Sequence, residues 1–310
     1  MRELIIPPAY NPTTSLAAIA VIFSVSLLSF FTNCIVLYLA YRLKDRLYNL
    51  SYQITLALTL TDLSSSISVF FMFVFHMIFG YKYVFSSSFY CPVFGAIMGV
   101  ASGISGVLIA CLAFERYMLV CHGRQLPSII SWVIFSIFFL ILISTSMISS
   151  IYNDFIPDPT YSYCLPMNSI SADIENIVIR VAFIGSLLVL TYCYIAIFIR
   201  CYRWTIAKHS DDSKSHEEAR MGKSVALQAL LFLIVYYLCF IPKLLVYFFK
   251  LALGKEHPVV LDILAPAGIA FAFVLNPAMV IFLNRHFRKE IGIVNNTLVG
   301  RKKLENFDLL

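Results

Sequence analysis

Charge is scarce in this chain. Only 13% of its 310 residues are Asp, Glu, Lys or Arg, while 60% are apolar and the mean hydropathy is +0.84. Soluble domains average about 25% charged and about 45–50% apolar residues. The composition therefore excludes an ordinary soluble protein and predicts an integral membrane protein, whose helices pack on one another inside the bilayer. The net charge of +6 then needs no nucleic-acid partner to explain it.

Several other patterns are missing. No ten-residue strands of alternating polarity occur, which excludes a transmembrane barrel. The eight cysteines show no C-x-x-C spacing, so we expect no metal site built on them. No nucleophile stands with a base and an orienting acid, and we expect no enzyme. Segment 1–15 lacks an apolar core followed by a cleavage site, so no removable signal peptide is expected.

Long apolar runs dominate what is present. About 20 apolar residues cross a bilayer as a helix, and short polar segments separate the runs. We predict an all-α membrane protein, a seven-transmembrane helix bundle forming one domain over 1–310. The predicted helices cover about 16–41, 50–79, 91–120, 127–152, 174–201, 224–249 and 259–284.

Lysine and arginine predict the direction of the chain, because they collect in cytoplasmic loops. If the N-terminus is outside, 17 of the 23 basic residues fall on the inner side. We therefore expect an extracellular N-terminus and a cytoplasmic C-terminus. The six basic residues left in the outer half are Arg2, Lys82, Arg180, Lys243, Lys250 and Lys255.

The segment CLAFERYMLV places Glu115 and Arg116 side by side at the inner end of the third run. Charges inside membrane helices are costly and often functional, although a pair at this place can simply mark where the membrane stops. Cys91 lies 25 residues before Arg116, and Cys164 lies in the loop after the fourth run. Both sulfurs would lie on the oxidising face, where disulfides persist. A bridge would pin that loop over the third helix, and two unrelated cysteines are the alternative.

This spacing, with the triplet ERY, resembles the rhodopsin-like (class A) G protein-coupled receptors. The resemblance covers nearly the whole chain, with polar or proline landmarks in most of the helices. LNRHFRKEI also looks like the short amphipathic eighth helix of that family, at about 285–294. The remaining landmarks are Asn33 in TNCIV, Asp62 in LTLTDL, Trp132, Tyr194, Phe240 and Pro242 in CFIP, and Asn276 and Pro277 in NPAMV.

The resemblance implies roles for these residues. A kink at Pro242 would let its helix swing outward at the inner end and open a cleft for a heterotrimeric G protein. A static kink used for packing is the alternative. Phe240, Pro242, Asn276 and Pro277 would form the activation switch. The G protein would meet Glu115, Arg116, Tyr117 and Tyr194.

The chain also departs from the family pattern. Val280 replaces the tyrosine of the NPAMV motif, and Ser186 stands where helix five usually has proline. No acid on helix six stands where it would lock Arg116, which leaves Glu115 as the expected partner. Eroded motifs with a short N-terminus and tail look most like the nematode serpentine chemosensory receptors.

Asp62 is the deepest acid, and a buried carboxylate must be protonated, paired or bound to a cation. By resemblance it faces Asn33, Ser105 and Asn276, and this oxygen-rich group could hold a sodium ion. The alternative is a neutral Asp62 in a hydrogen-bonded cluster that packs the helices.

The ligand end is described mostly by exclusions. Met98 stands where amine receptors place an aspartate, which disfavours a biogenic amine, and Ala270 stands where opsins place the retinal lysine. Lys243 and Arg180 fall in the outer half, with Asp262 as the obvious acid nearby. We hypothesise a small ligand with an anionic or strongly electronegative group, seated among Met98, Arg180, Lys243 and Phe240. The alternative is that these cations snorkel to the surface or pair with Asp262.

The sequence therefore predicts a plasma-membrane receptor that transduces an extracellular small-molecule or peptide ligand to a heterotrimeric G protein, and a chemosensory cue is the favoured ligand. A neuropeptide receptor of the same fold is the runner-up, because Asp154, Asp158, Asp173 and Glu175 could line an acidic vestibule. A seven-helix channel should have its N-terminus inside, and a transporter should show inverted repeats. Neither pattern fits this chain.

Overall fold

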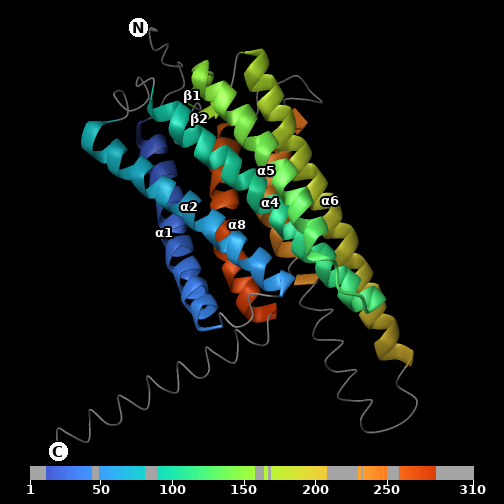
Figure 1. The fold of residues 1–310 in the computed structure, drawn as a ribbon. Coiled ribbons are helices and arrows are strands. Elements are labelled where there is room, and N and C mark those ends of the chain that lie inside the picture. Colours follow the sequence, from blue (N-terminus) through green and yellow to red (C-terminus); the bar gives the residue numbers. More distant parts are fainter. Residues whose placement is uncertain are drawn as a thin grey trace, which may run out of the picture.

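The protein is a bundle of long helices with one small hairpin at one end (Figure 1). The computed structural model describes residues 12–43, 49–80, 89–157, 164–166, 169–207, 230–231, 233–246, 248–249 and 258–283. Its long helices are α1 (Pro12–Arg42), α2 (Leu50–Phe79), α4 (Tyr90–His122), α5 (Ser128–Ile151), α6 (Ile170–Ala207) and α8 (Val259–Leu283).

A further helix, Leu233–Val246, lies between α6 and α8 along the chain. The six labelled helices are long and apolar enough to cross a membrane, and Leu233–Val246 is a shorter apolar helix. This arrangement agrees with the predicted seven-helix bundle. The amphipathic helix expected at 285–294 lies outside the described residues.

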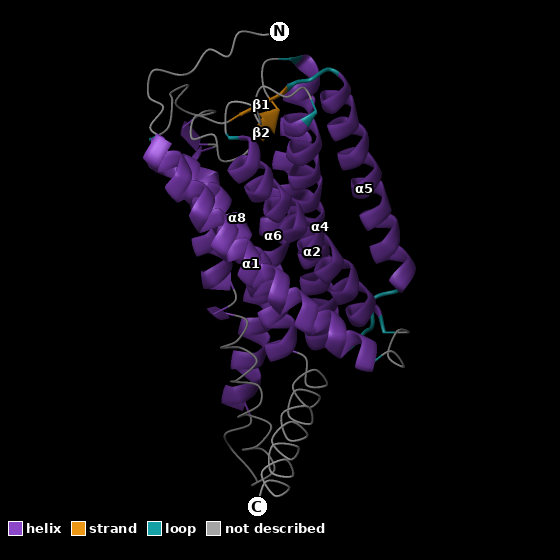
Figure 2. Ribbon diagram, turned by 90° about the vertical axis from the view of Figure 1, so that its left-hand side faces the viewer, coloured by secondary structure: helices purple, strands orange, loops and turns teal. Residues whose placement is uncertain are grey.

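Helix α4 is the centre of the bundle. It packs against α2, α5 and α6, while α1 packs against α2 and α8. Half of the apolar span of α4 is buried inside the protein, compared with 11% of the span of α5. Helix α5 therefore lies at the edge of the bundle (Figure 2), where its isoleucine-rich surface is suited to lipid rather than to a protein core.

The hairpin pairs β1 (Phe155–Pro157) with β2 (Cys164–Pro166) in antiparallel register, with Ile156 opposite Leu165. It lies across the end of the bundle at which α4 begins (Figure 2). Gly95 permits this position, because a Cβ atom there would collide with the ring of Phe155. Strands of three residues carry too little pattern to be predicted, and the sequence did not indicate them.

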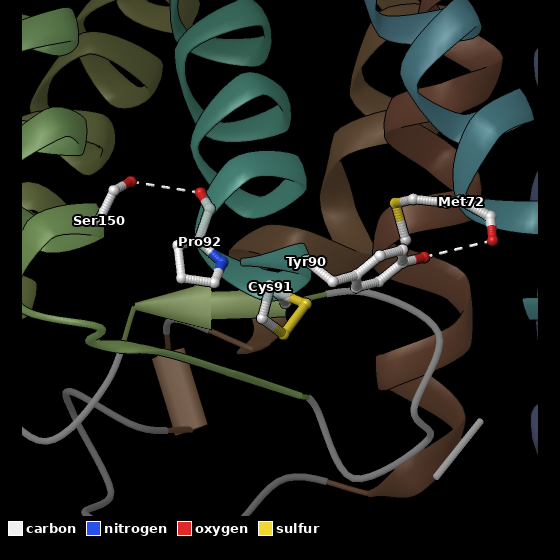
Figure 3. The surroundings of a disulfide bond; sticks show 6 residues. Met72, Tyr90, Cys91, Pro92 and Ser150 are labelled. Carbon is white, nitrogen blue, oxygen red and sulfur yellow. Dashed lines mark hydrogen bonds between the residues drawn. A yellow bond between two sulfur atoms is a disulfide. The ribbon is translucent and has the colours of Figure 1, made fainter. Parts of the chain in front are cut away.

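A disulfide joins Cys91 at the start of α4 to Cys164 in β2, which confirms the predicted bridge. Hydrogen bonds hold the same end of α4 to its neighbours (Figure 3). Tyr90 donates its hydroxyl proton to the Met72 carbonyl, and Ser150 donates to the Pro92 carbonyl. The hairpin is thus fixed over the helix that stands at the centre of the bundle.

Candidate functional site

Three cavities follow one another along the bundle. The first, which we name the hairpin cavity, has a volume of about 110 Å³ and lies beneath Phe155 and Cys164. A buried water needs roughly 10–15 Å³ on this measure, so the hairpin cavity has room for several waters or a small ligand. Its other lining residues are Met72, Phe94, Gly95, Met98, Gly99, Ser102, Glu175, Asn176, Ile179, Lys243, Pro266 and Ile269.

A second space, the middle cavity, shares Ser102, Ile179, Lys243 and Ile269 with the hairpin cavity and has a volume of about 40 Å³. It reaches down to Phe240, whose ring packs edge-on against Phe183 at 4.7 Å. The two cavities are therefore neighbouring parts of one space bounded by α4, α6, the helix Leu233–Val246 and α8.

The predicted ligand residues are only partly brought together. Met98 and Lys243 line the hairpin cavity, and Phe240 lines the middle cavity. Arg180 belongs to α6 but is not among the residues that line either cavity. The side chain of Asp262 lies outside the described residues. Sequence reasoning placed Glu175 among the acids of an outer vestibule, whereas the structure puts it, fully buried, in the wall of the hairpin cavity.

Below these cavities, three helices meet in a polar cluster that we name the Asp62 cluster. Ser105 of α4 donates to Asp62 Oδ1 at 2.9 Å, and Asn276 of α8 donates to Asp62 Oδ2 at 2.8 Å. All three side chains are buried. The predicted meeting of Asp62, Ser105 and Asn276 is therefore found, and it ties α2, α4 and α8 together at one point.

Asn33 lies beside this cluster with other hydrogen-bond partners. Its amide nitrogen donates to Ser29 and to the Phe273 carbonyl of α8, and among the described residues it makes no hydrogen bond to Asp62. The side-chain oxygens of Asn33 and Asn276 are both buried without a hydrogen-bond partner among the described residues. Two orphaned oxygens next to a buried carboxylate fit a hard cation, which prefers oxygen ligands.

The third space, the Arg116 cavity, lies at the far end of the bundle. Arg116 lines it together with Tyr194 of α6 and with Asn276, Met279 and Val280 of α8. Arg116 makes no hydrogen bond or ion pair with the described residues. Val280, which replaces the family tyrosine, is buried against Tyr52 and the C-terminal end of α1.

Glu115 does not pair with Arg116, contrary to the sequence expectation. Its carboxylate accepts a hydrogen bond from Ser51 at the start of α2 instead. Adjacent residues on a helix point in different directions and do not face each other. Glu115 therefore contacts α2, while Arg116 lines the cavity beside Tyr194. The helix-six segment compared with the family lock, Gly222 and Lys223, lies outside the described residues, as do Glu217 and Glu218.

The other residues predicted for G protein contact and for the activation switch lie in α4, in the helix Leu233–Val246 and in α8. The Tyr117 hydroxyl contacts the Tyr192 hydroxyl at 3.3 Å and His122 Nε2 at 3.0 Å, on an exposed face between α4 and α6. Pro242 lies inside the helix Leu233–Val246, and Pro277 lies inside α8. Thr191 of α6 and Tyr237 share a hydrogen bond of 2.8 Å, which joins α6 to that helix.

Trp132, another predicted landmark, donates its indole proton to Gln53 of α2 at 2.9 Å. Helix α5 is thus attached to α2 by a polar contact although most of its surface is exposed.

Comparison with known proteins agrees with this architecture. A family model described as 7 transmembrane receptor (rhodopsin family) matches residues 32–279. A search of curated proteins returned no match. The family model spans most of the chain, from Thr32 in α1 to Met279 in α8. The chain therefore belongs to the rhodopsin family of seven-transmembrane receptors.

Proposed function

We propose that the protein transduces an extracellular ligand, a small chemosensory cue, to a heterotrimeric G protein. One observation carries this proposal. The hairpin cavity, the Asp62 cluster and the Arg116 cavity follow one another in space along the length of one helix bundle. A ligand at one end can then bias the packing at the other. It does so to the extent that it binds one helix arrangement better than another.

The size of the hairpin cavity favours a small molecule over a peptide. Its volume of about 110 Å³ suits a compact molecule, and most of its lining is apolar or aromatic. Lys243 lies in its wall, and we propose that an anionic or hydrogen-bond-accepting group of the ligand approaches this lysine. Met98, in the wall of the hairpin cavity, and Phe240, in the wall of the middle cavity, would supply apolar contacts.

The motif departures support a further proposal on subfamily. Val280 and Ser186 replace two family landmarks, and such erosion is similar to that of the nematode serpentine chemosensory receptors. The orientation that we propose has the hairpin on the extracellular side, where the disulfide is chemically stable. The positive-inside distribution of lysine and arginine supports the same direction.

We also propose that a sodium ion binds at the Asp62 cluster. Asp62, Ser105 and the orphaned side-chain oxygen of Asn276 would hold it. The ion would supply a positive charge that stabilises the ionised Asp62 and one arrangement of α2, α4 and α8. Asn33 would add its orphaned side-chain oxygen, while its amide nitrogen stays bonded to the Ser29 and Phe273 carbonyls.

The test of signalling uses cells that express the receptor with a promiscuous G protein and a panel of small odorant-like molecules. We expect a saturable response to at least one compound that is absent from cells without the receptor. Purified receptor should also catalyse nucleotide exchange on the G protein in a reconstituted membrane. Failure of both the cellular response and the purified exchange reaction would overturn the proposed function.

A further inference from the structure

One hydrogen bond joins the helix Leu233–Val246 to α6 between the middle cavity and the Arg116 cavity. It links the hydroxyls of Thr191 and Tyr237 at 2.8 Å. Along α6, Thr191 lies after Leu187, which lines the middle cavity, and before Tyr194, which lines the Arg116 cavity. A change in helix packing that passes from one cavity to the other along these two helices therefore crosses the level of this bond.

The two hydroxyls depend on each other unequally. A threonine hydroxyl carries one proton, and Thr191 donates it to the Leu187 carbonyl of its own helix at 2.6 Å. Tyr237 is therefore the donor in the bond between the helices, and Thr191 is its only hydrogen-bond partner among the described residues. If the helices separate, Thr191 keeps its bond to Leu187, whereas the Tyr237 hydroxyl loses its acceptor inside the bilayer. The loss of that acceptor costs free energy, and this cost resists separation.

Helix α8 restricts the other side of the same segment. A Cβ atom on Gly268 would collide with the backbone carbonyl oxygen of Cys239, so α8 and the helix Leu233–Val246 touch there backbone to backbone. Cys239 lies two residues after Tyr237. The helix therefore has no room to move toward α8, and a shift in another direction displaces Tyr237 from Thr191. A side-chain hydrogen bond is lost beyond roughly 3.5 Å, so a shift of about 1 Å is enough to break this one.

We propose that the bond between Thr191 and Tyr237 is a latch that holds the helix Leu233–Val246 against α6 in the unstimulated receptor. Pro242, five residues after Tyr237, removes a backbone hydrogen bond and makes the helix easier to bend there. A receptor without the latch opens more often and signals more without ligand. The inference deepens the proposed function by naming a contact that keeps signalling low, and it rests on that function only where a G protein is the readout.

The first measurement needs no G protein. Cys239 is a buried free thiol of the helix that carries the latch, and a buried thiol reacts only when its surroundings open. Purified receptor in lipid nanodiscs is treated with N-ethylmaleimide, and the alkylation rate of Cys239 is read from peptide masses. Cys34 of α1, another free thiol, is the reference within the same molecule.

Tyr237→Phe removes the donor of the latch and Thr191→Val removes its acceptor, and both changes largely keep the shape of the side chain. Each should raise the alkylation rate of Cys239 relative to Cys34 about threefold or more, the effect of an average hydrogen bond between membrane helices. The double variant should react no faster than the faster single variant, since both changes remove the same bond.

Thr145→Val is the matched control. Like Thr191, Thr145 of α5 donates to a carbonyl of its own helix, but among the described residues it bonds to no other helix. Its alkylation rate should equal that of the wild type. The second measurement is nucleotide exchange on a reconstituted G protein without ligand. Exchange should rise in Tyr237→Phe and Thr191→Val together with the alkylation rate, and it should stay at the wild-type value in Thr145→Val.

Formation of the Cys91–Cys164 disulfide checks that each variant is folded. An unchanged alkylation rate in both single variants would overturn the latch, and so would increases that multiply in the double variant. Faster alkylation without higher basal exchange, in a receptor that does respond to a ligand, would overturn it as a control of signalling. A receptor that drives no exchange with any ligand would count against the proposed function alone, because the alkylation rates still test the latch.

Discussion

Ser51, at the start of α2, donates a hydrogen bond to the carboxylate of Glu115 near the end of α4. Glu115 is buried, and Arg116 beside it lines a cavity with Tyr194. The two charged neighbours therefore contact different helices. Glu115 attaches α4 to α2, and Arg116 remains directed at the contact between α4, α6 and α8.

Ser51→Ala should destabilise the receptor. The change leaves the buried Glu115 carboxylate without the hydroxyl of Ser51 as its donor, which costs about 1–3 kcal/mol. We expect a lower melting temperature for the purified protein in detergent. Ser24→Ala is the control, because Ser24 is exposed and bonds only to the Ala20 carbonyl of its own helix. Equal melting temperatures for Ser51→Ala and the wild type would show that the Glu115 contact contributes nothing to stability.

Cys91→Ser and Cys164→Ser should each reduce surface expression strongly, since loss of a native disulfide typically costs about 2–5 kcal/mol. The double variant should be no worse than either single one, because both changes remove the same bond. Cys34→Ser removes a free thiol of α1 and should express normally. The measurement is antibody staining of intact cells, and additive losses in the double variant would contradict this account.

Much of the fold follows from elementary features of the sequence. Apolar runs long enough to cross a bilayer predict the helices, and three polar residues far apart in the chain do meet as predicted, namely Asp62, Ser105 and Asn276. The resemblance to the receptor family implied this meeting, and it is physically reasonable because a polar side chain in a membrane helix must find polar partners in the bundle interior.

Other features could not be predicted, for identifiable physical reasons. The partners of Asn33 depend on how α1 is rotated against α8, and one of them is a backbone carbonyl, which carries no sequence signal. Glu175 lies one residue after the predicted start of its helix, at 174, and was interpreted as part of the outer mouth. The helix begins at Ile170 instead, so Glu175 lies a turn inside it and is buried.

Sodium should stabilise the receptor through the Asp62 cluster. A ligand that binds only the folded state raises stability in proportion to the logarithm of its concentration above its dissociation constant. We expect the melting temperature of the purified receptor to rise when sodium chloride replaces choline chloride at constant ionic strength. Asp62→Asn keeps the shape but removes the charge, and it should abolish the difference.

The control for this experiment is Asp154→Asn, which removes a buried acid bonded to Ser171 at the hairpin end. It should retain the response to sodium. A wild-type receptor whose melting temperature is the same in the two salts would rule out the ion and leave Asp62 as a packing residue.

The orientation can be tested without a ligand. An epitope tag placed before residue 1 should be stained on intact cells, because the basic residues collect toward the opposite side. A tag after residue 310 should be stained only after permeabilisation. The reverse result would place the hairpin and its disulfide on the reducing side and would contradict both the orientation and the receptor mechanism.

Arg116→Ala should separate signalling from binding. Arg116 lines the Arg116 cavity with Tyr194 and Asn276, whereas the hairpin cavity is lined by other residues. Removing the guanidinium should therefore reduce G protein activation about tenfold or more, as expected for the loss of charged hydrogen bonds to a partner. Ligand binding and surface expression should stay close to those of the wild type.

Arg42→Ala removes an exposed arginine in the last turn of α1 and serves as the charge-matched control. Nucleotide exchange on a reconstituted G protein is the measurement, normalised to the amount of receptor. If Arg116→Ala and Arg42→Ala activate the G protein equally well, Arg116 has no special part in coupling, and the contact must lie elsewhere on that end of the bundle.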